Sequence, residues 1–358
     1  MYLSNLILEN FRSYHHQTFE FGPKTNLVLG PNGSGKTNIL EAIYFLSCGK
    51  SFRSSSLSQL INWQSTFTSV RGQITKDSEP VELEVQLIKD PAKISLSRKF
   101  LIDQIAKTRP KYLGLLKTVI FEPEDIRLVT GSPGRRRDYL DSVFVSTEWR
   151  YAQSLSQYHR ALKHRNELLD QIKAGKSQRS ELFYWDQSLI KNDNLIHTYR
   201  QNFVKSVNTF FQNHSFPEIQ ALTINYHPSI ITPEKLANNY SFDLNFGYTQ
   251  IGIHRDDFSF DNSIFSAPDK NLAFWGSRGQ QRLAVLALRL SQINYLEETY
   301  SQKPILLLDD IFSELDPEHR QLVVDICVKY QTVFTSAEDS TASILPNSKE
   351  IHLSTAQI

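Results

Sequence analysis

A glycine-rich loop near the start of the chain restricts its fold more than any other feature. Residues 30–37 match the pattern G-x-x-x-x-G-K-[ST], which forms a phosphate-binding loop between a strand and a helix. The apolar run at residues 27–29 supplies the strand, and apolar residues at helical spacing follow from residue 36. The loop consists of Gly30, Pro31, Asn32, Gly33, Ser34, Gly35, Lys36 and Thr37.

Each part of this loop has a chemical role in holding a nucleoside triphosphate. The glycines let the backbone curl until consecutive N–H groups face the β-phosphate, and the helix start adds its partial positive charge. We expect Lys36 to reach the β- and γ-phosphate oxygens and Thr37 to coordinate Mg²⁺. The alternative, an ordinary glycine-rich turn, does not account for the flanking strand and helix. The loop predicts binding of ATP or GTP.

A second motif lies near the other end of the chain. Residues 305–308 are apolar and are followed by Asp309 and Asp310, as in a buried parallel strand whose carboxyl end faces a ligand. We expect Asp309 to hold Mg²⁺ and Asp310 to orient or deprotonate the water that attacks the γ-phosphate. Aspartate is one methylene shorter than the glutamate common at this position, so we expect slow hydrolysis. The alternative is two solvent-facing aspartates that close a strand.

A pentapeptide stands between these motifs and opens an amphipathic helix: Ser277, Arg278, Gly279, Gln280 and Gln281. Ser277 can cap that helix, whose first turn then offers N–H groups to an anion. A capped helix needs no ligand, so the pentapeptide alone leaves its role open. Combined with the other two motifs it indicates an ABC-type arrangement, in which this helix end reaches the γ-phosphate bound by a partner copy. ATP would then hold a dimer together.

Composition narrows the class of protein. Lys and Arg total 39 against 38 Asp and Glu among 358 residues, so any nucleic-acid surface must be a local patch. Two cysteines, Cys48 and Cys327, cannot form a disulfide framework or a four-ligand zinc site, which favours a reducing compartment. The sequence contains neither a signal peptide nor an apolar run of about 18 residues. We expect a soluble cytoplasmic protein.

The order of the expected elements predicts a helical insertion in an α/β protein. Strands are expected at residues 3–9, 19–21, 27–29, 81–88, 93–100 and 119–121. Residues 135–212 contain little Gly or Pro and keep helical spacing, with a break at 174–176. The later elements expected are strands at 222–225, 242–246 and 258–260, a helix at 278–297, a strand at 304–308, a helix at 317–329 and a strand at 332–335.

This alternation of strands and helices predicts a parallel core sheet with crossovers. We expect an ABC-type P-loop ATPase head with a helical second lobe inserted in the middle of the chain. The expected parts are an ATPase lobe I at residues 1–125, a helical lobe II at 126–215, and the second part of the ATPase domain at 216–358.

With its three motifs in this order, the chain resembles the SMC-like branch of the ABC ATPases, and within that branch the RecF family of bacterial recombinational repair proteins. The similarity extends over the whole length. Further segments that carry it are residues 9–14 (ENFRSY), 121–125 (FEPED), 131–137 (GSPGRRR) and 252–258 (GIHRDDF).

The resemblance implies an ATP-dependent homodimer on DNA, at single-strand gaps or junctions with double-stranded DNA, that helps RecO and RecR to load the recombinase RecA. It also implies roles in replication and the SOS response, and a weak ATPase that acts as a clamp switch. In the implied site, Arg12 contacts ATP, Ser277, Gly279 and Gln280 act on the partner's nucleotide, and Asp316 belongs to a partner-facing D-loop.

Four positions depart from the pattern of ABC ATPases or of this family. Residues 121–125 contain no glutamine where a Q-loop would lie, and either Thr335 or Ser336 stands where a switch histidine is common. Arg278 occupies a position that is often a small residue, and Ile253 stands where proline is expected. These departures affect the expected kinetics more than nucleotide binding.

Three groups of basic residues are candidate DNA contacts. They are Arg135, Arg136 and Arg137 after a Pro-Gly turn, Lys163 and Arg165 on a helix, and Lys50 and Arg53 in a serine-rich loop. A solvated surface is the alternative for each group. Because no base-reading motif is present, we expect binding to follow DNA structure rather than sequence.

Other ATPase classes fit the sequence less well. An ABC subunit with a membrane partner, or with another DNA partner, is the main alternative. The membrane form is disfavoured by the strand at the first residues, the helical insertion and the missing Q-loop glutamine. A structural SMC-type protein would need hundreds of heptad-patterned residues between Thr37 and Ser277, and the insertion is far too short for that. A GTPase or kinase would not carry a Ser-x-Gly-Gln helix before the acidic strand.

Overall fold

The computed structural model describes residues 1–54, 56–76, 79–90, 95–265, 269–338, 341–345 and 347–354. The chain forms two compact units, Met1–Asp125 with Gln292–Ile358, and Ile126–Ser291. Within the described residues, no helix combines the length and apolar character needed to cross a bilayer.

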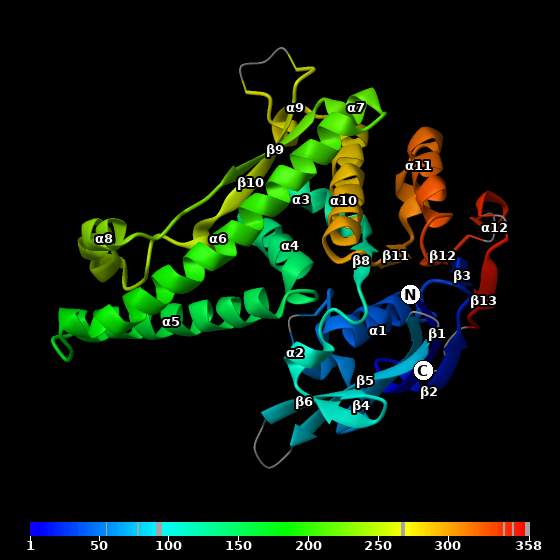
Figure 1. Ribbon diagram of the computed structural model, residues 1–358, viewed down its shortest axis with the longest axis horizontal. Coiled ribbons are helices and arrows are strands. Elements are labelled where there is room, and N and C mark those ends of the chain that lie inside the picture. The colour runs from blue at the N-terminus through cyan, green and yellow to red at the C-terminus, as the bar shows by residue number, and fades with distance from the viewer. Residues whose placement is uncertain are drawn as a thin grey trace. The chain divides into compact units, whose positions relative to one another are not determined.

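The first unit contains a five-stranded sheet in which every neighbouring pair is parallel (Figure 1). The strand order is β13-β3-β12-β11-β8. Buried apolar residues fill β11 up to Asp309, as expected for a strand covered on both faces. Because the strands run in one direction, their carboxyl ends lie along one edge of the sheet. The strands are β3 (Thr25–Leu29), β8 (Thr118–Phe121), β11 (Ile305–Asp309), β12 (Thr332–Ser336) and β13 (Lys349–His352).

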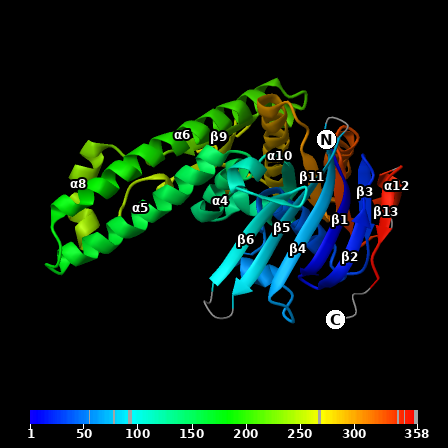
Figure 2. The ribbon, with the colours of Figure 1, turned by 60° about the horizontal axis from the view of Figure 1, so that its bottom comes forward.

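A six-stranded antiparallel sheet, β2-β1-β4-β5-β6-β7, forms the other sheet of this unit (Figure 2). The predicted hairpin partner of residues 81–88 is confirmed, because β5 pairs with β6 from Leu83 opposite Ile102 to Asp90 opposite Ser95. Residues 93 and 94 of that prediction lie outside the described residues. The strands are β1 (Tyr2–Phe11), β2 (Tyr14–Glu20), β4 (Phe67–Lys76), β5 (Glu79–Asp90), β6 (Ser95–Ile102) and β7 (Ile105–Lys107).

Helix α1 (Lys36–Cys48) lies between the two sheets and contacts strands of both. It is buried from Ile39 to Cys48, a stretch in which most residues are apolar. The helix ends at Gly49, whose φ of +68° is open to glycine at little cost. Other helices of this unit are α2 (Arg109–Tyr112), α11 (Pro317–Cys327) and α12 (Thr341–Ile344).

The second unit is built on two long antiparallel helices, α5 (Trp149–Lys173) and α6 (Leu182–Asn213), which Figure 1 shows in green. The break predicted at residues 174–176 is confirmed as the turn between them, with Gly175 at a φ of +70°. Other elements of the unit are α3 (Arg127–Thr130), α4 (Pro133–Val145), α7 (Pro217–Gln220), β9 (Leu222–His227), α8 (Pro233–Phe246), β10 (Asp257–Asn262) and α9 (Leu272–Trp275). The last helix, α10 (Arg278–Tyr300), continues across the division into the first unit.

The strand predicted at residues 242–246 is wrong, because these residues form the end of α8. Alternation of apolar and polar residues suggested a strand, but the helix signals are stronger. Thr232 caps the helix by accepting a hydrogen bond from the Lys235 N–H, Pro233 occupies its first turn, and Gly247 ends it in a left-handed conformation.

The second unit begins at residue 126, where the helical lobe was expected to start, but it extends to residue 291 rather than 215. The antiparallel pair β9 and β10 belongs with the helices because β9 packs against α6. The Asn208 side chain of α6 donates to the Ile224 carbonyl (2.9 Å) and accepts from its N–H (2.8 Å). The pentapeptide at residues 277–281 therefore lies in the second unit.

Candidate functional site

The glycine-rich loop joins the end of β3 to the start of α1, as predicted. Gly33 and Gly35 have φ angles of +83° and +97°, which side chains rarely adopt. A Cβ on Gly30 would lie 2.8 Å from Ser34 Oγ and 2.8 Å from the Leu353 carbonyl oxygen. Positive φ angles at Gly33 and Gly35 and the lack of space for a side chain at Gly30 therefore explain the three glycines of the loop.

Lys36 bends back over the loop that precedes it. Its Nζ donates to the carbonyl oxygens of Gly30 (2.6 Å) and Pro31 (3.0 Å). Burial lowers the pKa of the Lys36 ammonium, while the nearby carboxylates of Asp310 and Asp309 act in the opposite direction. The Lys36 ammonium is therefore held against the loop by two carbonyl oxygens, and phosphate oxygens can replace these as its hydrogen-bond acceptors.

The loop also contains an orphaned polar atom. Ser34 Oγ is buried and has no hydrogen-bond partner in the described part of the chain. A buried hydroxyl normally finds a partner, because leaving it unpaired costs about 1–3 kcal/mol. Together with the backbone N–H groups at the start of α1, this hydroxyl fits an anionic ligand such as a phosphate.

Thr37 and Asp309 meet at the edge of the parallel sheet although 272 residues separate them. Thr37 Oγ1 donates to Asp309 Oδ1 (2.9 Å) and Oδ2 (3.1 Å). Mg²⁺ in phosphate-transfer sites commonly binds one or two protein oxygens, substrate phosphates and water. A hydroxyl oxygen beside a carboxylate is such a donor set, so these two residues fit the metal they were predicted to hold.

Asp310 adopts a left-handed backbone conformation, with φ +48° and ψ +34°. Asp and Asn tolerate this region better than longer side chains. The conformation therefore supplies a reason for aspartate at this position besides the reach of its carboxylate.

Two residues, Thr335 and Ser336, are candidates for the switch position. Thr335 contacts Asp309, whereas Ser336 Oγ contacts Thr341 Oγ1 at 2.7 Å.

Arg12 is held by a carboxylate that the sequence analysis missed. Its Nε and Nη2 donate to the two carboxylate oxygens of Glu41 at 2.8 and 2.7 Å, and the Glu41 side chain is fully buried in α1. Nη2 also donates to Ser54 Oγ (2.6 Å) and Nη1 to the Gln59 carbonyl (3.0 Å). These bonds use four of the five guanidinium N–H groups, so a direct contact of Arg12 with ATP stays a prediction.

Tyr14, in the same ENFRSY segment, contacts the phosphate loop directly. Its hydroxyl donates to the Gly35 carbonyl at 3.2 Å. A Cβ on Gly35 would lie 2.6 Å from that hydroxyl oxygen, so the tyrosine requires glycine there. The turn after β1 is thus packed onto the loop that was predicted to hold the nucleotide.

In the second unit, the pentapeptide opens α10 with a reciprocal cap. The Gln280 N–H donates to Ser277 Oγ (3.3 Å), and the Ser277 N–H donates to Gln280 Oε1 (2.9 Å). Gln281 is buried and donates to the Gly276 and Leu272 carbonyls. The predicted cap is confirmed, and Ser277 and Gly279 are exposed at the helix start. Their action on a partner's nucleotide stays a prediction.

Asp316 caps α11 in the first unit. It accepts from the His319 N–H (3.0 Å) and contacts His319 Nδ1 (2.6 Å). The backbone hydrogen bond from His319 lowers the pKa of Asp316, with further help from the His319 side chain. The exposed position of Asp316 suits a partner-facing loop, and its role there stays a prediction.

Two of the predicted DNA contacts are buried in ion pairs. Arg165 is 1% exposed and donates to Asp186 (2.7 Å) and Asp243 (2.7 Å). Arg136 forms a bidentate ion pair with Asp257, in which Nε donates to Oδ1 (2.6 Å) and Nη2 donates to Oδ2 (2.9 Å). Both were predicted from charge alone, and folding directs them inward to carboxylates distant in sequence. We therefore remove them from the DNA candidates.

The other basic candidates are more accessible. Lys163 is 76% exposed, with Glu167 at 3.9 Å, and Arg53 is exposed while donating to Asn38 Oδ1 at 3.2 Å. The remaining three, Lys50, Arg135 and Arg137, are partly exposed. Arg137 donates to the Asp256 carbonyl at 2.9 Å. Of these five candidates, Lys50 and Arg53 belong to the first unit, and Arg135, Arg137 and Lys163 belong to the second.

The GIHRDDF segment contributes mainly to the interior of the second unit. Asp256 is fully buried and accepts from Arg200 Nη1 (2.6 Å), the Tyr226 hydroxyl and the Ser229 N–H (2.8 Å). A Cβ on Gly252 would lie 2.0 Å from the Tyr158 hydroxyl oxygen. This segment is therefore constrained by packing and buried charge within its own unit.

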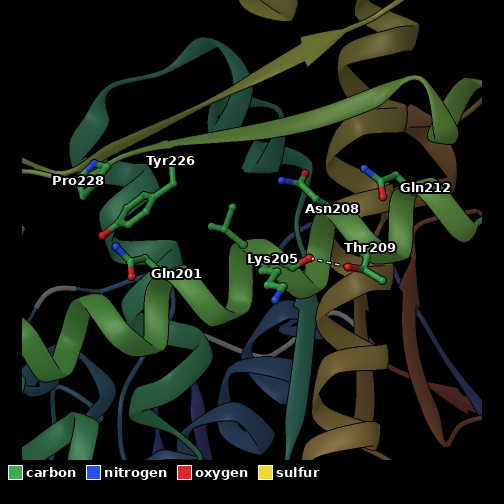
Figure 3. Close-up of a pocket in the computed structure, with 8 residues that line it drawn as sticks. Gln201, Lys205, Asn208, Thr209, Gln212, Tyr226 and Pro228 are labelled. Atoms are coloured by element: carbon green, nitrogen blue, oxygen red, sulfur yellow. Dashed lines mark hydrogen bonds between the residues drawn. The ribbon is translucent and has the colours of Figure 1, made fainter.

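A surface hollow of the second unit lies between α6 and β9 (Figure 3). Its lining residues are Gln201, Val204, Lys205, Asn208, Thr209, Gln212, Tyr226 and Pro228. Among the described residues, none of the predicted site residues lines it.

Comparisons with known proteins agree with the motifs. The family model described as the RecF/RecN/SMC N terminal domain matches residues 2–342. A protein named DNA replication and repair protein RecF, from Leptospira interrogans, is 34% identical and covers 95% of this chain and 92% of its own. A protein of the same name from Thermoanaerobacter sp. (strain X514) is 35% identical, covering 94% of each chain.

Solved structures agree as well. A structure of the recombination mediator protein RecF with ATPrS, described as part of the RecFOR pathway, has a TM-score of 0.83 and 31% identity over 95% of this chain and 93% of its own. An Smc head domain from Pyrococcus furiosus has a TM-score of 0.53 and 17% identity, covering 99% and 94%, and shares the fold.

Proposed function

This chain belongs to the RecF/RecN/SMC N-terminal domain family, and from that premise we propose that it is an ATP-hydrolysing, DNA-binding protein of recombinational repair and replication. One observation carries the proposal: the phosphate loop and the acidic strand converge, so that Thr37 Oγ1 lies 2.9 Å from Asp309 Oδ1 and Lys36 lies over the loop. The known RecF structures with ATP and ATPrS support ATP as the nucleotide.

Each residue of the site has a role in hydrolysis. The loop N–H groups and Lys36 bind the β- and γ-phosphates and stabilise the charge that spreads over the γ-phosphate oxygens. Thr37 and Asp309 would hold Mg²⁺, which would neutralise charge and orient the phosphates when bound. Asp310 orients the attacking water and accepts its proton. Because the aspartate reaches less far than a glutamate, we propose that hydrolysis is weak. From the membership of the RecF/RecN/SMC family we further propose that DNA stimulates it.

We further propose that two copies close around ATP. The capped start of α10 presents Ser277 and Gly279 to solvent, where its N–H groups and positive helix end suit the γ-phosphate bound by a second copy. ATP binding then favours the dimer by linkage and hydrolysis releases it, so that ATP acts as a clamp switch.

The biological role that we propose follows the relatives. The dimer binds DNA at single-strand gaps or at junctions of single- and double-stranded DNA, without sequence preference. There it acts with RecR and RecO to load RecA, supports the SOS response, and does so in the cytoplasm. The relatives named as DNA replication and repair proteins and the RecFOR pathway of the solved RecF structure support this role.

The proposed function has a direct test in solution. Sedimentation velocity is measured on the protein with gapped DNA in the presence of ATP and Mg²⁺, and again with ADP and Mg²⁺. We expect two copies per DNA with ATP and one or none with ADP. Equal stoichiometry with both nucleotides, or no binding to gapped DNA at all, would contradict the proposal.

Two basic residues on α5 provide a matched pair for the DNA surface. Lys163→Met removes an exposed charge, and Arg165→Met removes a charge buried between Asp186 and Asp243. If Lys163 contacts one phosphate, its replacement reduces the slope of log affinity against log salt by about 0.9 without changing the melting temperature. Arg165→Met is expected to destabilise the protein by about 3–5 kcal/mol, because it leaves Asp243 buried without its cation. An unchanged salt slope would remove Lys163 from the DNA surface, and unchanged stability of Arg165→Met would contradict the burial argument.

A further inference from the structure

Thr335 lies beside the acidic motif on the neighbouring strand. In the parallel register of β11 and β12, Asp309 pairs with Thr335, so both reach the same edge of the sheet. Thr335 is fully buried. A buried hydroxyl must direct its hydrogen bonds to groups in its immediate surroundings, and here those groups are the two aspartates.

The hydroxyl of Thr335 contacts both aspartate residues. Oγ1 donates to Asp309 Oδ1 at 2.8 Å and accepts from the Asp310 N–H at 3.2 Å. The Leu308 carbonyl is a second possible acceptor at 3.4 Å, but the shorter bond to a carboxylate is the stronger one. One hydroxyl therefore bridges the Asp309 carboxylate and the Asp310 backbone.

The contact with Asp309 determines which way its carboxylate faces. Thr37 donates to both oxygens of Asp309, and Thr335 donates to Oδ1 alone. Both hydroxyl protons point at the carboxylate, which leaves the lone pairs of Thr37 Oγ1 available to a cation. Groups that orient a metal ligand in this way commonly change metal affinity by 10- to 100-fold when they are removed.

The contact with Asp310 supports an unfavourable backbone conformation. Left-handed φ and ψ values cost a non-glycine residue on the order of 1 kcal/mol or more and persist only when surrounding bonds hold them. The Asp310 N–H is shared between Thr335 Oγ1 (3.2 Å) and the Thr335 carbonyl oxygen (3.2 Å). Thr335 thereby sets the direction in which the Asp310 side chain leaves the strand.

We propose that Thr335 is a positioning residue that aligns the Mg²⁺-binding carboxylate of Asp309 with the water-activating carboxylate of Asp310. The inference rests on the proposed function of the same site. Thr335 itself need not contact the nucleotide, because it acts through the two aspartates.

The test uses Thr335→Val, which keeps the shape of the side chain and the backbone bond to Asp310 but removes the hydroxyl. The control is Thr332→Val, an equally buried threonine at the other end of β12, whose hydroxyl donates to the Tyr330 carbonyl at 3.3 Å. Thr335→Ser retains the hydroxyl and serves as the rescue. Binding of a fluorescent ATP analogue is measured against Mg²⁺ concentration and, separately, in excess EDTA.

We expect the Mg²⁺ concentration for half-maximal binding to rise about 10-fold in Thr335→Val, while affinity in EDTA changes less than about twofold. Thr332→Val and Thr335→Ser are expected to match the unmodified protein. An unchanged Mg²⁺ midpoint in a folded Thr335→Val, or the same shift in Thr332→Val, overturns the proposal. If Thr335→Val fails to fold, Thr335→Ala replaces it: a raised Mg²⁺ midpoint in Thr335→Ala but not in Thr335→Ser supports the proposal, and equal midpoints overturn it. Failure of the unmodified protein to bind the analogue would instead overturn the proposed function.

Discussion

Replacing Lys36 with methionine is expected to lower ATP affinity about 10- to 100-fold and hydrolysis about 100- to 1,000-fold. The loss of ATP affinity follows from the loss of charge-assisted hydrogen bonds to the phosphates, which contribute about 1.5–3 kcal/mol. The larger loss of hydrolysis rate reflects the removal of a hydrogen-bond donor that faces the charge developing in the transition state. Methionine retains most of the side-chain volume, so the loop keeps its packing. Equilibrium binding of a fluorescent ATP analogue and release of phosphate measure the two effects.

The matched control for this variant is Lys24→Met. Lys24 is exposed in the same unit, immediately before β3, the strand that leads into the loop. Lys24→Met removes the same positive charge, but residue 24 is not part of the phosphate loop. If Lys36→Met bound ATP as tightly as Lys24→Met, the assignment of residues 30–37 as the nucleotide site would be wrong.

Replacing Ser277 is expected to separate ATP binding from dimer formation. Aspartate is as good a helix cap as serine, so Ser277→Asp retains the start of α10 while it places a negative charge where the partner's γ-phosphate is proposed to lie. ATP affinity should stay within about twofold of the unmodified protein, because Ser277 does not belong to the phosphate loop. ATP-dependent dimers and hydrolysis should both disappear. Sedimentation with ATP and Mg²⁺ measures the dimer.

A second variant and a control make this result interpretable. Ser277→Arg removes the cap and adds bulk, and it is expected to have the same effect on the dimer with a lower melting temperature. Ser263→Asp changes an exposed serine of the same unit and should leave ATP binding and dimerisation unaltered. A Ser277→Asp protein that still dimerises with ATP would refute the role of the pentapeptide in a partner's site.

The phosphate loop could be predicted from sequence because its determinants are local. Gly33 and Gly35 have left-handed φ angles, and Lys36 and Thr37 begin the helix that follows. A strand, a turn and a helix start within about ten residues specify that arrangement without help from the rest of the chain. The acidic strand was predictable for the same reason, since four apolar residues before two aspartates describe a buried strand and its end.

The partners of these residues could not be read from local pattern. Glu41 looks like one more polar residue on a helix, yet it is fully buried and paired with Arg12, 29 positions away. Thr335 had a usable signal, because parallel strands bring their carboxyl ends together and Thr335 lies at the carboxyl end of the strand predicted at residues 332–335. The register that places it beside Asp309 rather than a neighbour is a property of the assembled sheet.

Charge patterns gave the least reliable predictions. Lys163 and Arg165 stand two residues apart on one helix, but a helix turns by about 200° over two residues and directs them to different sides. Lys163 is exposed, whereas Arg165 packs against Asp243 of α8, a segment that was itself predicted to be a strand. The direction of each side chain depends on what packs against the helix.

The sequence by itself determined the chemistry of this protein: a phosphate loop with Lys36 and Thr37, an acidic strand ending in Asp309 and Asp310, and a capped helix start at Ser277. Each of these is encoded in a few consecutive residues whose backbone conformations and charges act over one turn or one strand end. Only the tertiary structure decided which hydroxyls orient the aspartates, which cations are buried, and that the helix start lies in a different unit from the loop. Those outcomes depend on contacts between residues 21 to 272 positions apart, because burial and strand register are set by the whole fold.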